Sequence, residues 1–174
     1  MERTLDSTLL HLERTRLLDD FPAQIGECLD LMTDDDVWWR PNETANALGN
    51  LVLHLAGSNR YYIAYAIGGR EIERDRDAEF AARRNPGRLE VVKLWDETVR
   101  ISREVLESLD PTRLMETTDR TGKSTTIAAL LLHASHHTAV HLGQIVWITK
   151  MRHPGAMTEL WIRTRDRLAS ARKS

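Results

Sequence analysis

The sequence predicts an all-α protein, a four-helix bundle with a long crossover between helices 2 and 3 and an extra helix at its C-terminal end. Four segments carry apolar residues at helical spacing, and polar stretches rich in turn formers join them. No segment shows the two-residue alternation typical of a half-buried strand. We expect residues 1–174 to form a single domain, because 174 residues is close to the usual size of one.

The first helix is predicted to begin near Leu5 and to bend near Phe21. Apolar residues recur at helical spacing up to position 18, and Pro22 then restarts the pattern, since proline suits the first turn of a helix. The only cysteine, Cys28, lies on the apolar side of this second piece. It cannot form an internal disulfide, and this predicts a cytoplasmic protein.

Residues 33–45 are predicted to be a connection, because they contain turn formers and Pro41 excludes helix at the residue before it. Trp38 and Trp39 are two bulky side chains within this connection. We interpret them as anchors for packing or for an interface, since tryptophan buries a large apolar area.

The second helix is expected over residues 46–67, with His54 near its middle and Gly68-Gly69 as its stop. Residues 70–87 alternate in charge and end in a turn sequence. This pattern predicts a long, solvated crossover to the third helix.

The third helix is predicted over residues 89–109, followed by a polar loop to Lys123 in which a short hairpin is an alternative. Ser124 or Thr125 can cap the fourth helix, which should run to about Met151. A basic helix over residues 161–171 completes the expected set.

Composition excludes several classes of function. Lys plus Arg number 24 and Asp plus Glu 26, so the formal net charge of −2 does not favour nucleic acid as a partner. The N-terminal residues are too charged for a secretory signal, and no apolar run approaches the ~20 residues that span a bilayer. We therefore expect neither a nucleic-acid partner nor a membrane partner.

Histidines are concentrated on the fourth helix. His133, His137 and His141 are spaced by four residues and so lie on one stripe, and Gln144 continues it. Buried imidazoles need partners, because an unsatisfied buried polar group costs about 1–3 kcal/mol. A shared metal ion satisfies several at once, and neutral imidazole is a common ligand of zinc and nickel.

A third ligand must come from another helix, and His54 is the candidate, since bundles build metal sites from side chains on facing helices. Spacing alone does not decide whether His133 and His137 or His137 and His141 form the pair. The alternative is a histidine-rich helix without a metal, because an isolated His-x-x-x-His motif has low specificity.

Two segments of the chain resemble the DinB/YfiT-like superfamily of metalloenzymes. The first is residues 39–43 (WRPNE) leading into residues 50–59 (NLVLHLAGSN), and the second is residues 137–145 (HTAVHLGQI). Residues 73–80 (ERDRDAEF) are similar to one branch of that superfamily. The resemblance spans about residues 22–152 and implies a four-helix bundle with a three-histidine metal site.

The resemblance implies that His54, His137 and His141 bind one divalent ion, zinc or nickel. By their positions on the helix, His133 is a candidate for a hydrogen bond to a ligand or substrate, and the Gln144 amide is a candidate for orienting His141. An ordinary structural role is as consistent for His133, and bracing of the helix packing is the favoured interpretation of Gln144. The resemblance also implies a metal-dependent enzyme acting on a small-molecule substrate, with a low-molecular-weight thiol as nucleophile and S-transfer as the leading reaction.

Two alternatives remain open at this point. One is metal-dependent hydrolysis, although no carboxylate lies on the histidine stripe to act as a general base. The other is a non-catalytic helical interaction module, with Trp38 and Trp39 at a homodimer interface.

Overall fold

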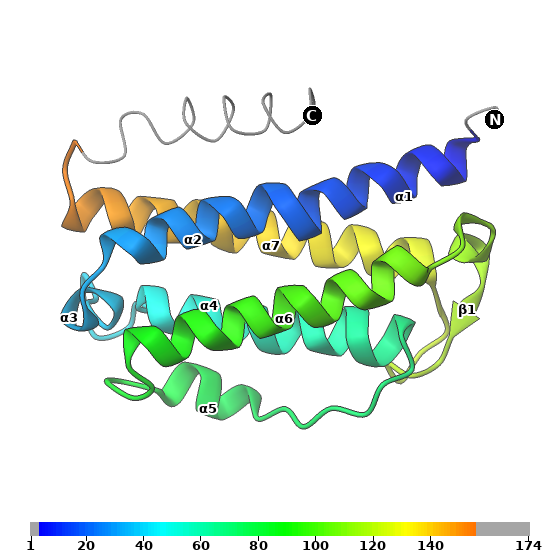
Figure 1. The fold of residues 1–174 in the computed structure, drawn as a ribbon. Coiled ribbons are helices and arrows are strands. Elements are labelled where there is room, and N and C mark those ends of the chain that lie inside the picture. Colours follow the sequence, from blue (N-terminus) through cyan, green and yellow to red (C-terminus); the bar gives the residue numbers. More distant parts are fainter. Residues whose placement is uncertain (1–3, 156–174) are drawn as a thin grey trace.

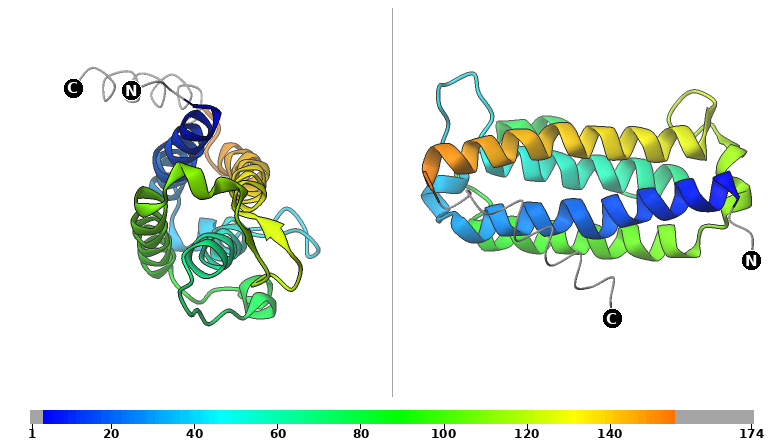
Figure 2. Two further views of the ribbon diagram at one scale, coloured as in Figure 1. Left: turned by 90° about the vertical axis from the view of Figure 1, so that its right-hand side faces the viewer. Right: turned by 90° about the horizontal axis from the view of Figure 1, so that it is seen from above.

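The computed structural model describes residues 4–155, which form a bundle of four long helical rods (Figure 1). Seen along its axis, the bundle has these rods around a common centre (Figure 2, left). The rods are α1–η1–α2 (Leu5–Thr15, Arg16–Asp20 and Phe21–Leu31), α4–η2 (Leu48–Asn59 and Arg60–Ile67), α6 (Arg88–Ser108) and α7 (Ile127–Arg152). The predicted all-α bundle is confirmed.

The first rod is helical throughout. A bend was expected near Phe21, but the irregular segment of the helix lies just before that residue. A π-helical segment, η1, joins α1 to α2, whereas Phe21 has ordinary helical angles of φ −69° and ψ −44°. Pro22 lies in the first turn of α2 and has no N–H to donate to the preceding turn; the carbonyl of Leu18, four residues before it, accepts from Arg103 at 2.7 Å. Cys28 is fully buried, as its apolar neighbours predicted.

The connection at residues 33–45 contains a short helix, α3 (Asp34–Val37), that the sequence analysis did not predict. Thr33 and Asp36 form a capping box, in which each side chain bonds to the other residue's backbone N–H. Trp38 is buried and donates from Nε1 to the carbonyl of Pro86 at 3.0 Å. Its predicted anchoring role is therefore confirmed within the chain.

The crossover returns along the length of the bundle, since α4 and α6 run in the same direction (Figure 1). The prediction that all of it is solvated is wrong. A six-residue helix, α5 (Arg76–Ala81), packs against α4, and its Glu79 is only 8% exposed. Asp75 caps this helix by accepting from the N–H of Ala78, and local polarity gives no sign of the burial.

A short hairpin does join α6 to α7. After the 3-10 helix η3 (Pro111–Met115), β1 (Thr117–Thr118) pairs antiparallel with β2 (Thr125–Thr126). The cap of α7 is Thr126, whose hydroxyl accepts from Ala129 N–H, and not Ser124 or Thr125 as expected. The helix expected at residues 161–171 lies outside the described residues.

The core consists of two apolar clusters, one toward each end of the bundle. On α4 and its continuation η2, one cluster ends at Ala56 and the other begins at Ile63. Buried polar side chains occupy the level between them, namely Ser58, Asn59, Thr98, Ser102, Ser135 and Thr138. Within residues 4–155, no helix is long and apolar enough to cross a membrane.

Candidate metal centre

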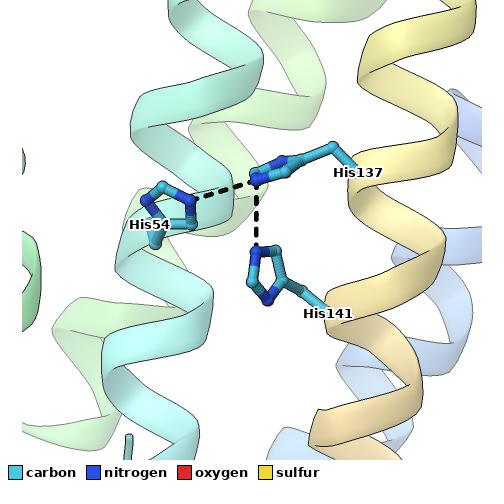
Figure 3. Close-up of side chains that lie close together, drawn as sticks. All are labelled: His54, His137 and His141. Carbon is cyan, nitrogen blue, oxygen red and sulfur yellow. Dashed lines mark hydrogen bonds between the residues drawn. The ribbon is translucent and has the colours of Figure 1, made fainter.

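The rings of His54, His137 and His141 meet between α4 and α7 (Figure 3). Their spacing of four residues places His137 and His141 on the same face of α7, and that face is directed at α4. The Nε2 atom of His137 lies 3.1 Å from Nε2 of His54 and 3.1 Å from Nε2 of His141. All three ligand atoms lie within 4.8 Å of one another.

The other nitrogen of each ring has a polar partner. Nδ1 of His54 lies 2.8 Å from a carboxylate oxygen of Glu79, and Nδ1 of His141 lies 2.7 Å from the amide oxygen of Gln144. Nδ1 of His137 lies 3.2 Å from the hydroxyl of Ser58. These partners turn each Nε2 toward a common point, as is usual for histidine ligands of metal ions.

A divalent cation satisfies the three Nε2 atoms better than protons shared between the rings do. Nδ1 of neutral His54 and His141 carries the proton, because each faces an oxygen that only accepts, so both Nε2 atoms present lone pairs. Both lone pairs face Nε2 of His137, which can carry one proton and satisfy only one of them. Zinc-bound nitrogens in a tetrahedral site lie roughly 3.3 Å apart, close to the 3.1 Å of the two pairs that include His137.

Burial favours the neutral form of two of the three imidazoles, those of His137 and His141. Burial, together with the neighbouring His141 and His54 rings, lowers the pKa of His137 to about 4. Burial also lowers the pKa of His141, against the hydrogen bond to Gln144 that raises it. Neutral rings are the form that binds a metal ion, so both lowered pKa values favour metal binding by His137 and His141.

Glu79 forms a buried ion pair behind His54. Arg74 donates to both carboxylate oxygens, from Nε at 2.8 Å and from a terminal nitrogen at 3.1 Å. Burial alone would raise the pKa of Glu79, but the hydrogen bonds from His54 and Arg74 and the charge of Arg74 keep it below its ordinary value. The carboxylate is therefore charged and faces Nδ1 of His54.

Access to the cluster is uneven. His54 is only 6% exposed, and the ring of Phe80 covers it at a centroid distance of 4.6 Å, whereas His137 and His141 are half-buried. A cavity of about 330 Å³ lies along the same two helices, lined by Leu51, Gln144, Trp147, Ile148 and residues of the 41–46 loop. Gln144 thus contacts both the cluster and the cavity.

The remaining candidates lie at the edge of the cluster or away from it. His133 is exposed, with its ring 4.4 Å from that of Tyr62 and stacked at 5.8 Å on that of His137. His136 is exposed on the same helix. Arg60 donates to the hydroxyl of Thr98. Among the described contacts, none of these three side chains is hydrogen-bonded to the triad.

Glu79 and Ser58 are the contributors that sequence reasoning missed. Ser58 lies one turn after His54 on the same helix, so the i, i+4 rule could have found it. Glu79 lies within a charged segment whose polarity indicated solvent. The sequence feature that could have indicated Glu79 is the similarity of residues 73–80 to one branch of DinB-like proteins. That similarity assigned no role to any residue of the segment.

The arrangement of helices is that of DinB-like proteins. A DinB-like protein from Bacillus subtilis superposes with a TM-score of 0.63 at 21% identity, covering 83% of this chain and 94% of that one. A DinB-like protein from Bacillus cereus gives 0.64 at 15% identity, covering 87% and 95%. A conserved protein from Enterococcus faecalis gives 0.63 at 14% identity, covering 86% and 97%.

One family model, described as protein of unknown function (DUF1572), matches residues 7–165. No match to a curated protein was found. The resemblance inferred from the histidine motifs is confirmed for the fold, and the three-histidine cluster is compatible with a metal site in that fold.

Proposed function

The chain belongs to the DUF1572 family of proteins of unknown function, and on that premise we propose that it is a metal-dependent enzyme. His54, His137 and His141 hold one divalent ion, zinc or nickel, and a small molecule reacts beside it. The observation that carries the proposal is the convergence of three Nε2 atoms whose partner nitrogens are each bonded elsewhere.

Three protein ligands suit a reactive centre more than a structural one. Structural zinc sites are closed by four protein ligands, whereas catalytic sites keep a position for water or substrate. The bound ion would supply Lewis acidity, favouring the thiolate form of a thiol or the hydroxide form of water. Within residues 4–155, the metal-ligating side chains gathered here number three, all histidines.

Thiol-dependent S-transfer is the reaction that we favour. The thiol sulfur forms a bond to an electrophilic carbon, the leaving group departs with its electron pair, and the thiol proton passes to solvent. This chemistry needs no carboxylate base at the site. Glu79 is already bound to His54 and Arg74, so it is not available as a base for hydrolysis, which stands second.

A small-molecule substrate is consistent with the cavity along α4 and α7. Its volume of about 330 Å³ and its mixed lining of Leu51, Trp147 and Gln144 suit a small, partly apolar molecule. We place the protein in the cytoplasm. The competing proposal is a non-catalytic, metal-stabilised module that acts through a homodimer, with Trp39, which is only partly buried, at its interface.

Elemental analysis of protein purified without chelator tests the proposal. We expect roughly one divalent ion per chain, as a single three-ligand centre requires. His54→Ala should lose the ion, while His136→Ala, which replaces an exposed histidine of α7, should keep it. Screening low-molecular-weight thiols against electrophiles then tests the reaction. A protein that stays empty when offered zinc or nickel contradicts the proposal.

A further inference from the structure

We propose that Glu79 is a positioning residue that fixes the tautomer and orientation of His54. In this proposal, the role of α5 in the crossover is to hold Glu79 against His54. The inference rests on the proposed metal site, since its purpose is to present Nε2 of His54 to the ion. It assigns a role to the segment over residues 73–80, which the proposed reaction does not otherwise use.

The contact between Glu79 and His54 is short and shielded. The carboxylate oxygen lies 2.8 Å from Nδ1, and the two side chains are 9% and 7% exposed. An ionised carboxylate can only accept, so it requires the Nδ1–H form of the neutral ring. The lone pair then remains on Nε2, which is the atom directed at His137. The bond a ring nitrogen makes thus determines which nitrogen is free for a metal.

Arg74 and Gly57 make this arrangement possible. A buried carboxylate without a countercharge is costly, and the two hydrogen bonds from Arg74 provide that charge. The pair is seated against Gly57 of α4, where an added Cβ would overlap a carboxylate oxygen of Glu79 and lie 2.9 Å from Nε of Arg74. Glycine at position 57 therefore lets the ion pair approach the helix that carries His54.

Side chains of α4, of the 33–45 connection and of the crossover itself hold α5 in place. A helix of six residues is unstable alone, because nucleation is unfavourable and few bonds follow it. Asn50, one turn before His54, donates to the carbonyls of Glu79 and Ala82 at 2.9 and 3.0 Å. Arg40 donates to Ala82 as well, at 3.0 Å, and Arg83 donates to the carbonyls of residues 80–82. The helix is thus fixed to α4 at the level of the histidine.

The partners of the other two rings, Ser58 for His137 and Gln144 for His141, are uncharged and therefore make weaker hydrogen bonds. Gln144 is exposed and uncharged, and Ser58 can either donate to His137 or accept from it. Glu79 provides the charged and buried contact, so its loss should have the largest effect on ring orientation.

Nitrogen NMR of His54 in metal-free protein tests the inference directly, because the shifts of the two ring nitrogens report the tautomer. We expect Nδ1–H in the unsubstituted protein, a mixture in Glu79→Ala, and retention of Nδ1–H in Glu79→Gln, whose amide oxygen still accepts. Cobalt(II) affinity should fall ~10–100-fold in Glu79→Ala. Glu73→Ala removes an equal charge from an exposed site of the same segment and should change neither readout.

A fully Nδ1–H ring in folded Glu79→Ala overturns the inference. So does a loss of cobalt affinity in Glu73→Ala as large as that in Glu79→Ala, since charge alone would then explain it. If the unsubstituted protein binds no cobalt, the proposed function fails, and the tautomer in metal-free protein still decides the role of Glu79. If Glu79→Ala does not fold, Glu79→Gln decides: loss of the Nδ1–H form there contradicts the inference.

Discussion

Replacing His141 and His133 in turn distinguishes the two possible pairs on α7. His141 places Nε2 3.1 Å from Nε2 of His137, whereas His133 only stacks its ring on His137 at 5.8 Å. Loss of a direct ligand should exceed the ~10–100-fold effect typical of second-sphere partners. We therefore expect at least a ~100-fold loss of zinc affinity in His141→Ala and a change of only a few-fold in His133→Ala.

Thermal denaturation followed by circular dichroism measures this difference. Free zinc at 100 times the dissociation constant stabilises the folded state by about 2.7 kcal/mol, and at a concentration equal to that constant by only about 0.4 kcal/mol. For a chain of this size, 1 kcal/mol shifts Tm by about 2–4 °C. Zinc should thus raise Tm by roughly 5–11 °C in the unsubstituted protein, by roughly 4–8 °C in His133→Ala after a loss of affinity of about three-fold, and by only about 1–2 °C in His141→Ala. A zinc effect retained by His141→Ala and lost by His133→Ala would refute the assignment.

Two further predictions concern the bundle itself. Chelation should lower Tm while leaving the far-ultraviolet helical signal at 25 °C intact, because the two apolar clusters make most of the core; complete unfolding would indicate a structural ion. Asp36→Asn should destabilise the protein by about 2 kcal/mol at pH 7, since it loses charge-assisted bonds from Thr33 and Arg152. Burial would raise the pKa of Asp36, but those bonds hold it well below its ordinary value. The stabilisation is therefore present above the unfolded pKa of about 4 and is lost as pH falls toward the folded value. Urea denaturation at pH 7 and pH 3 checks this, and a difference between the two proteins that does not shrink at pH 3 counts against it.

The long helices could be predicted because each repeats the same physical signal over several turns. On α6, Trp95 and Val105 lie in the core as helical periodicity predicts, and α7 begins and ends within two residues of expectation. The fold class could be predicted from these apolar stripes and the polar connections between them alone.

The missed features depend on contacts that no local pattern encodes. A six-residue helix such as α5 contains fewer than two turns and carries little periodicity. Glu79 is buried because it pairs with Arg74 and with His54, which lies 25 residues away. The π-helical segments η1 and η2 likewise follow no composition rule that we applied. The register of the triad came from the family resemblance, since spacing alone also permitted His133.

The triad joins parts of the chain that are distant in sequence, and this determines when an ion can act during folding. His54 and His137 are 83 residues apart, and α6 with both flanking connections lies between them. Their rings meet only after α4 and α7 have packed, which is a non-local event. An ion that waits for the finished bundle cannot nucleate it. It should leave the folding rate nearly unchanged and slow unfolding instead, so its benefit is kinetic persistence of the native state.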